Sequence, residues 1–223
     1  MTEHILNPRI IENKDWATLL FVLSFVLITI TKASNEGRFG DFINLIYSDK
    51  YMKVYRDPSY QNSRFSFAFF WVQCISFAFF IHLSMSILNN TPKTDYLRYI
   101  QVITFFIFFI LTKQLISKII GTAFDIEENI EQFNIQKATY RTYIGLIILP
   151  FNVILFYNEN ISVLFPQVLL AIILIMNTLG YILAIKNYQN LIISKLFYFI
   201  LYLCTLEIAP YFFMYYWYTK VSA

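Results

Sequence analysis

A single carboxylate, Glu207, lies in the middle of an almost unbroken apolar run, FILYLCTLEIAPYFF, at residues 199–213. Pro210 follows three residues later and removes one backbone hydrogen bond from the preceding turn, which weakens the helix beside the acid. Lys195 and Lys220 bracket the segment, so Glu207 lies about 18 Å or more from either end of a helix. Because a glutamate side chain cannot span that distance, the carboxyl group must be protonated or paired inside the membrane.

Three polar side chains in other apolar runs are the candidate partners of this acid: Lys113, His82 and Asn177. Together with Glu207 they form a candidate intramembrane polar site, with Pro210 as the adjacent helix break. Two roles are open for Glu207: a relay for protons or ions, or a structural acid that fixes helix packing. Lys113 has an alternative of its own, because a lysine can extend its side chain to the membrane surface.

The sequence carries no recognisable catalytic set. It has two histidines and five glycines, and it lacks the H-E-x-x-H and G-x-S-x-G patterns, Cys/His metal spacing and a phosphate-binding loop. The acids Asp125, Glu127, Glu128 and Glu131 resemble a metal-binding cluster, but such a run is more often the solvated face of a helix. We therefore predict no enzyme activity, cofactor or metal.

Composition places the chain in a membrane. Of its 223 residues 58% are hydrophobic and only 14% are charged, against about 25% charged in soluble domains. Long uncharged stretches separate the charged clusters, and a spanning helix needs about 20 apolar residues. In such a protein the net charge of +3 reports topology and gives no indication of nucleic-acid binding.

The pattern predicts one all-α domain over residues 1–223, a polytopic helix bundle with about six transmembrane helices and one or two amphipathic helices. The predicted spans are residues 16–32, 65–88, 97–117, 143–157, 163–185 and 196–218. The fourth is short and contains Pro150 and Asn152, so it either forms a hairpin with the fifth or only enters the membrane partway.

Positive charge sets the expected orientation, because basic loops stay in the cytoplasm. The loops after the first, third and fifth spans carry eleven of the seventeen Lys and Arg residues, and the other side carries five. We expect both termini on the periplasmic side. Lys113 lies within a span and belongs to neither count.

Two polar segments have helical patterns of their own. Residues 38–57 place Phe39, Phe42, Ile43, Ile46, Tyr47, Val54 and Tyr55 at mostly helical spacing. This segment is either an amphipathic helix in the headgroup layer or a soluble helix packed on the bundle. Residues 124–141 contain the four acids and are expected as a solvated helix outside the membrane.

The two ends of the chain resemble a known family. The stretches NKDWATLLFVLSFVL at residues 13–27 and NLIISKLFYFILYLCTLEIAPYFFMYYW at residues 190–217 are similar to an uncharacterised integral-membrane family of Bacteroidota, domain-of-unknown-function family 4271. The resemblance implies an inner-membrane protein of a diderm bacterium. It implies no activity, although Glu207 lies within the matching stretch.

Three functions remain as hypotheses. The first is a non-enzymatic accessory or scaffold subunit of an inner-membrane complex, of the protein-export or envelope-assembly type, with membrane lipids and other integral membrane proteins as partners. The second is a small ion- or proton-coupled carrier that uses Glu207. The third and weakest is a lipid-modifying enzyme.

Overall fold

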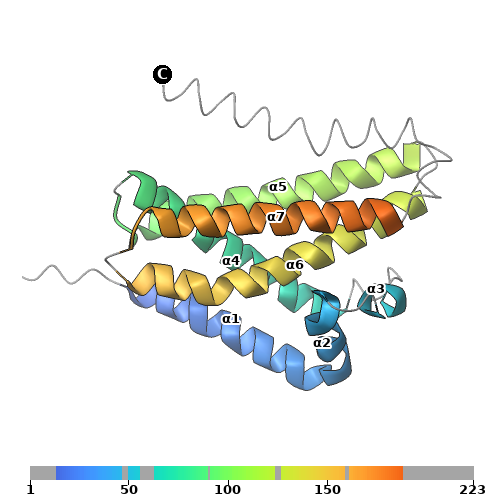
Figure 1. The fold of residues 1–223 in the computed structure, drawn as a ribbon, viewed down its shortest axis with the longest axis horizontal. Helices are drawn as coiled ribbons and strands as arrows, with labels where there is room; N and C mark the ends of the chain where they lie inside the picture. Colours follow the sequence, from blue (N-terminus) through green and yellow to red (C-terminus); the bar gives the residue numbers. More distant parts are fainter. Residues whose placement is uncertain are drawn as a thin grey trace, which may run out of the picture.

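The structure, a computed structural model, describes residues 14–46, 50–55, 63–89, 91–123, 127–158 and 161–187. Over these residues the chain is all-helical, as the sequence predicted, and no strand occurs in them. Figure 1 shows long helices packed lengthwise into a bundle, with the short helices grouped at one end. The elements in chain order are α1 (Asp15–Ser34), α2 (Glu36–Ile43), the 3-10 helix η1 (Asn44–Ile46), α3 (Lys50–Val54), α4 (Arg64–Asn89), α5 (Tyr96–Ala123), α6 (Glu127–Tyr157) and α7 (Leu164–Asn187).

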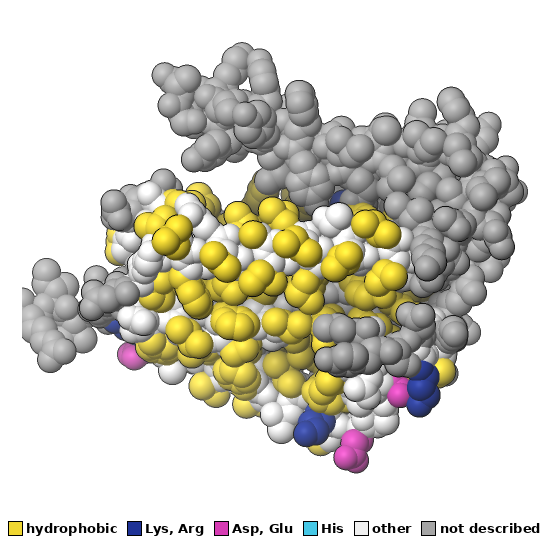
Figure 2. Space-filling view, in the orientation of Figure 1, with side chains coloured by type: hydrophobic (Ala, Val, Ile, Leu, Met, Phe, Trp, Pro, Cys, Tyr) yellow, Lys and Arg dark blue, Asp and Glu magenta, His cyan; other side chains and the backbone are white. Residues whose placement is uncertain are grey.

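Five of the described helices are long and apolar enough to cross a membrane: α1, α4, α5, α6 and α7. They correspond to the first five predicted spans. Five helices of this length and composition indicate a membrane protein. Figure 2 shows hydrophobic side chains over the middle of the visible face and charged side chains towards its ends. The sixth predicted span, with Glu207 and Pro210, lies outside the described residues.

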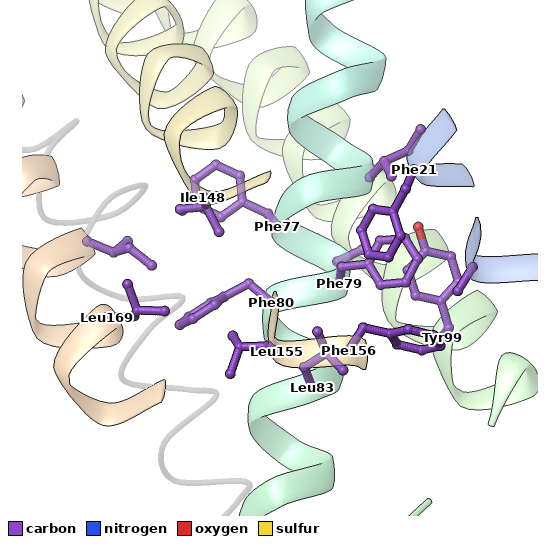
Figure 3. Packing of buried hydrophobic residues seen from close by; sticks show 14 of the residues in the cluster. Phe21, Phe77, Phe79, Phe80, Leu83, Tyr99, Ile148, Leu155, Phe156 and Leu169 are labelled. Carbon is purple, nitrogen blue, oxygen red and sulfur yellow. The ribbon is translucent and has the colours of Figure 1, made fainter. Parts of the chain in front are cut away.

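Helix α4 is the central helix of the bundle. It is the most buried of the five spanning helices, and it packs against α1, α5 and α6. Figure 3 shows how Phe77, Phe79 and Phe80 of α4 point in different directions towards these neighbours and α7. Phe79 stacks on Phe21 of α1, with ring centroids 4.3 Å apart, and its ring lies tilted against that of Tyr99 of α5 at 4.4 Å. Aromatic side chains from four helices therefore form one continuous core.

Several hydroxyl groups inside the spans donate to carbonyls of their own helix. Ser24 donates to the carbonyl of Leu20 at 2.8 Å, and Thr178 donates to that of Leu174 at 2.8 Å. A bond to the carbonyl four residues earlier removes the cost of placing a hydroxyl in an apolar environment. The uncharged polar residues of these runs are therefore compatible with spanning helices.

Helix α6 corrects one sequence expectation. Residues 124–141 were expected as a separate solvated helix before a short fourth span, but α6 is continuous from Glu127 to Tyr157, with 31 residues and a length of about 46 Å. This length exceeds the roughly 30 Å hydrocarbon core of a bilayer. The fourth span is therefore not short, since Pro150 lies inside a helix that continues on both sides.

In the described part of the segment between α1 and α4, the chain forms two short α-helices, α2 and α3, and the 3-10 helix η1. Phe39 and Phe42 of α2 and Tyr51 of α3 are buried against Phe65 and Phe69 at the start of α4. Phe42 stacks on Phe69 with centroids 5.3 Å apart. This geometry favours the packed soluble arrangement over the interfacial helix, because the aromatic face contacts protein instead of lipid. Ile43 and Val54, which were assigned to the same apolar face, are half exposed.

Arg38 fastens these short helices to α4. Its guanidinium carbon lies 4.3 Å from the ring centroid of Phe65, and its Nη1 donates to the hydroxyl of Ser63 at 2.7 Å. The guanidinium also lies 5.0 Å from the ring centroid of Tyr55. A planar cation stacked on aromatic rings combines charge with contact area. We refer to residues 36–55 below as the aromatic cap.

Candidate functional site

His82 is a structural histidine at one end of the bundle. It is fully buried in α4, and its Nε2 lies 3.1 Å from the carbonyl oxygen of Lys93, in the loop between α4 and α5. Ser86 of α4 also donates to that loop, at the carbonyl of Thr91. Trp16 of α1 donates its indole N–H to the carbonyl of Thr94 at 3.2 Å. His82 thus helps to hold a loop, and no group of three metal-binding side chains occurs among the described residues.

The same loop is bonded to the end of α6. The ammonium of Lys93 donates to the carbonyls of Leu155 at 3.0 Å and Asn158 at 2.8 Å. These carbonyls belong to the last turn, where a helix has no internal donors left and carries partial negative charge. Lys93 therefore caps α6. Together with the contacts of Trp16 and His82, it brings the ends of α1, α4, α5 and α6 together around the loop. We call this end the 91–95 end of the bundle.

Helices α4 and α6 are joined by polar contacts along their length. Thr142 of α6 donates to Oε1 of Gln73 at 2.7 Å, and the amide of Asn152 donates to the backbone carbonyl of Ser76 at 2.7 Å. Such bonds between spanning helices contribute about 0.6–2 kcal/mol each. Asn152, one of the two residues that made the fourth span doubtful, is therefore a packing residue.

A cavity of about 490 Å³ lies deeper in the bundle, among α4, α5, α6 and α7. It has basic, polar and apolar walls, and we call it the basic cavity. Lys113 comes from α5, Lys137 and Arg141 come from α6, and Asn177 and Tyr181 come from α7. The other described lining residues are Phe77, Phe106, Phe109, Ile110, Leu174 and Thr178.

Helical spacing explains why these side chains meet. Phe106, Phe109, Ile110 and Lys113 lie three or four residues apart on α5, and Leu174, Asn177, Thr178 and Tyr181 repeat that spacing on α7. Residues spaced in this way share one face of a helix. On each helix this face begins with apolar side chains and continues with polar ones, at Lys113 of α5 and from Asn177 of α7. The two faces line the same cavity.

The two cations of α6 are held differently. The ammonium of Lys137 lies 5.3 Å from the ring centroid of Tyr181 and 5.4 Å from that of Phe133, within the range of cation–π attraction. Arg141, one turn further along α6, also lines a second cavity of about 440 Å³ that extends towards the aromatic cap. Arg141 thus lies between two cavities, where its planar guanidinium is suited to bidentate binding of a carboxylate or phosphate.

The predicted site residues divide into three groups. Lys113 and Asn177 line one cavity, whereas His82 is bonded to the loop at the 91–95 end. Glu207 and Pro210 lie outside the described residues. Among the acids of the 124–131 run, Glu127 and Glu131 are exposed at the start of α6, which fits a solvated face, and Asp125 is not described.

Lys137 and Arg141 are the site residues that the sequence reasoning missed. They were counted as loop cations because the fourth span was taken to begin at residue 143. Their spacing of four residues places them on one helix face, but that spacing does not show that the face lines a cavity.

Comparison with known proteins assigns the chain to one family. No curated protein and no solved structure matches the chain significantly. The family model described as a domain of unknown function, DUF4271, matches residues 17–218. This range covers four of the described spanning helices completely and α1 except for its first two residues, together with the basic cavity and Glu207. The chain therefore belongs to the DUF4271 family.

Proposed function

We propose that the protein is a non-enzymatic accessory or scaffold subunit of a larger inner-membrane complex, of the protein-export or envelope-assembly type, with both termini in the periplasm. The observation that carries this proposal is the outer face of α5. Of its 28 residues only Tyr99, Ile110, Ser117 and Gly121 are fully buried. Its exposed residues include a row of large apolar side chains on which another spanning helix can pack.

The exposed face of α5 is distinct from the face that lines the basic cavity. Phe105, Phe108, Leu115 and Ile119 repeat at intervals of three, seven and four residues and are all more than half exposed. Large aromatic side chains supply much of the contact area in protein interfaces. Gln73 and Asn152 form hydrogen bonds between α4 and α6, which supports a structural subunit.

Site-specific photo-crosslinking tests the proposal. A benzoylphenylalanine at Phe108 of α5, 68% exposed, is compared with one at Leu19 of α1, 65% exposed. We expect a discrete protein adduct from position 108 and none from position 19, and we expect mild-detergent preparations to contain one membrane protein in fixed stoichiometry with this chain. A monomer or homodimer by native mass spectrometry, with no adduct at either position, contradicts the scaffold function.

The basic cavity favours a second function, an ion- or proton-coupled carrier that uses Glu207. Ionisable residues within a bundle are common components of proton and ion pathways. The carrier function requires Glu207 to release a proton, which glutamine cannot do. It predicts that Glu207→Gln assembles normally but fails to complement a deletion strain, whereas the scaffold function predicts that loss of complementation follows loss of assembly.

A further inference from the structure

The cavity of about 440 Å³ next to the aromatic cap lies between the start of α4, the later half of α5 and the middle of α6. It is at the end of the bundle that carries the short helices (Figure 1), and we call it the cap-side cavity. Aromatic rings of α2, α3 and α4 form one part of its wall. The polar part consists of Ser66, Gln73, Gln114, Thr139, Arg141 and Thr142. A cavity of this size that combines apolar walls with a few hydrogen-bonding groups is typical of a ligand site.

The wall of the cap-side cavity reaches the lipid-facing surface of the bundle between α4 and α5. Phe67 of α4 and Leu111 of α5 both line the cavity, and both are exposed. Gln114, which follows Leu111 on the same face of α5, is exposed as well. Exposed apolar side chains of spanning helices face the acyl chains of the bilayer. A lipid can therefore contact the cavity and the bilayer at the same time.

The polar groups of this cavity lie near one edge of the hydrocarbon core. Counted from the 91–95 end at about 1.5 Å per residue, Gln73 and Arg141 lie about 24 Å along their helices and Gln114 lies about 27 Å along α5. The hydrocarbon core of a bilayer is roughly 30 Å thick. Lys118, exposed one turn beyond Gln114, lies at about 33 Å and is therefore at the headgroup level. The polar groups thus lie where the phosphates and glycerol esters of a leaflet meet its acyl chains.

Three side chains supply hydrogen-bond donors at this depth. Gln73 accepts a bond from Thr142 at its Oε1, at 2.7 Å, so its amide nitrogen is the atom that can donate to a ligand. Gln114 supplies a second amide. The guanidinium of Arg141 has five N–H donors in a planar fork, enough to keep an interaction within the protein and also to bind an oxyanion. Basic pockets between spanning helices are typical binding sites for lipid head groups.

We propose that the cap-side cavity binds a glycerophospholipid from the adjacent leaflet. The phosphate lies against the guanidinium of Arg141, and the ester carbonyls accept hydrogen bonds from the amides of Gln73 and Gln114. One acyl chain leaves the cavity past Phe67 and Leu111 and enters the bilayer. Inorganic phosphate lacks the chains and diacylglycerol lacks the phosphate, so neither satisfies both parts of the wall. The lipid site does not depend on the scaffold or the carrier function.

Native mass spectrometry of the full chain in detergent tests the class of ligand. The protein receives dipalmitoylphosphatidylglycerol, dipalmitoylglycerol or inorganic phosphate at equal concentrations. We expect it to retain the phospholipid, to retain neither of the other two, and to keep the phospholipid when inorganic phosphate is added in excess. Equal retention of the diacylglycerol would mean that the site ignores phosphate, and displacement by inorganic phosphate would mean a site for free anions. Either result, or no retained phospholipid, overturns the proposal.

Two pairs of variants test whether the lipid occupies this cavity. Arg141→Gln should lower phospholipid retention by about tenfold or more, because bonds to a charged group are lost. Its control is Lys118→Gln, which removes the same charge from an exposed position. Ala138→Leu adds bulk to the cavity wall without changing charge and should also prevent binding. Its control is Ala171→Leu, at an exposed position of α7.

The controls should keep retention within about twofold of the parent, as exposed substitutions usually do. Size-exclusion chromatography and circular dichroism identify the variants that keep the parent fold. Gln114→Leu provides a further test at an exposed position, where leucine suits a spanning helix, and should lower retention by about fivefold. Parent-like retention in the folded cavity variants, or an equal loss in the controls, overturns the assignment of the lipid to this cavity.

Discussion

Gln73 of α4 and Gly145 of α6 lie in direct backbone contact at the centre of the bundle. A Cβ atom added at Gly145 would lie 3.1 Å from the Cα of Gln73 and 3.0 Å from its Cβ. The close approach is accompanied by the 2.7 Å bond from Thr142 to the Gln73 side chain, almost one turn away. A glycine that permits close approach next to an interhelical hydrogen bond is a common packing arrangement of membrane helices.

This contact predicts opposite effects for two glycine substitutions. Gly145→Ala should destabilise the protein by about 1–3 kcal/mol, because the new methyl group meets the backbone of α4 and separates the helices. Gly40→Ala is the control, because Gly40 is also helical and has no atom within 4 Å of an added Cβ. The higher helix propensity of alanine should stabilise the protein by up to about 1 kcal/mol. Thermal unfolding in one detergent measures both, and equal melting temperatures would contradict the close contact.

The aromatic cap makes a prediction about neighbouring residues of α2. Phe42 is 2% exposed and Ile43 is 49% exposed. In a Cys74→Ala/Cys204→Ala background, Phe42→Cys should therefore resist a water-soluble thiol reagent while Ile43→Cys reacts. Brominated lipids should fail to quench a fluorophore at position 42. Strong quenching at position 42 would instead support an amphipathic helix in the headgroup layer.

Tyr51 predicts a specific alkaline titration. Burial in the cap raises the pKa of its phenol above 10.0, and the nearby Arg38 guanidinium offsets only part of that increase. Because the folded protein retains this proton longer than the unfolded chain, Tyr51 destabilises the fold as the pH rises above about 10. An ultraviolet titration of the parent minus that of Tyr51→Phe should show one phenol with a midpoint above 10. A midpoint at or below 10 would mean that the ring is solvated.

The proposed topology predicts which ends of the helices reagents can reach. Tyr96, at the start of α5, and Glu127, at the start of α6, are both exposed and lie at opposite ends of the bundle. In spheroplasts of the cysteine-free background, an impermeant thiol reagent should label Tyr96→Cys directly and Glu127→Cys only after lysis. An alkaline phosphatase fusion at Ala223 should be active. The reverse labelling pattern would show that the protein has the opposite orientation in the membrane.

Hydrophobic runs were sufficient to predict the first five spans, because a bilayer demands about 20 apolar residues wherever a helix crosses it. They could not predict where α6 begins. Arg141 and Lys137 interrupt the apolar pattern, and only the three-dimensional structure shows that they line a cavity inside the bundle. Lys113 could be placed within a span because apolar residues flank it on both sides, whereas Lys137 and Arg141 lie at the edge of an apolar run.

The cap and the loop contacts were also beyond sequence reasoning. The helical spacing of Phe39 and Phe42 identifies an apolar face but does not say whether lipid or protein covers it. The sequence offered His82 as a candidate partner of Glu207, and in the structure its ring contacts the carbonyl of Lys93 in the loop between α4 and α5. Such pairings depend on how helices are positioned laterally, which local periodicity does not encode.

Lys93 links two parts of the chain that are made at different times. The contacts of Trp16, His82 and Ser86 with residues 91–94 need only α1, α4 and the loop itself. The acceptors of the Lys93 ammonium, the carbonyls of Leu155 and Asn158, are made more than 60 residues later. Completion of α6 therefore adds the last of these contacts to a loop whose other contacts need only earlier residues.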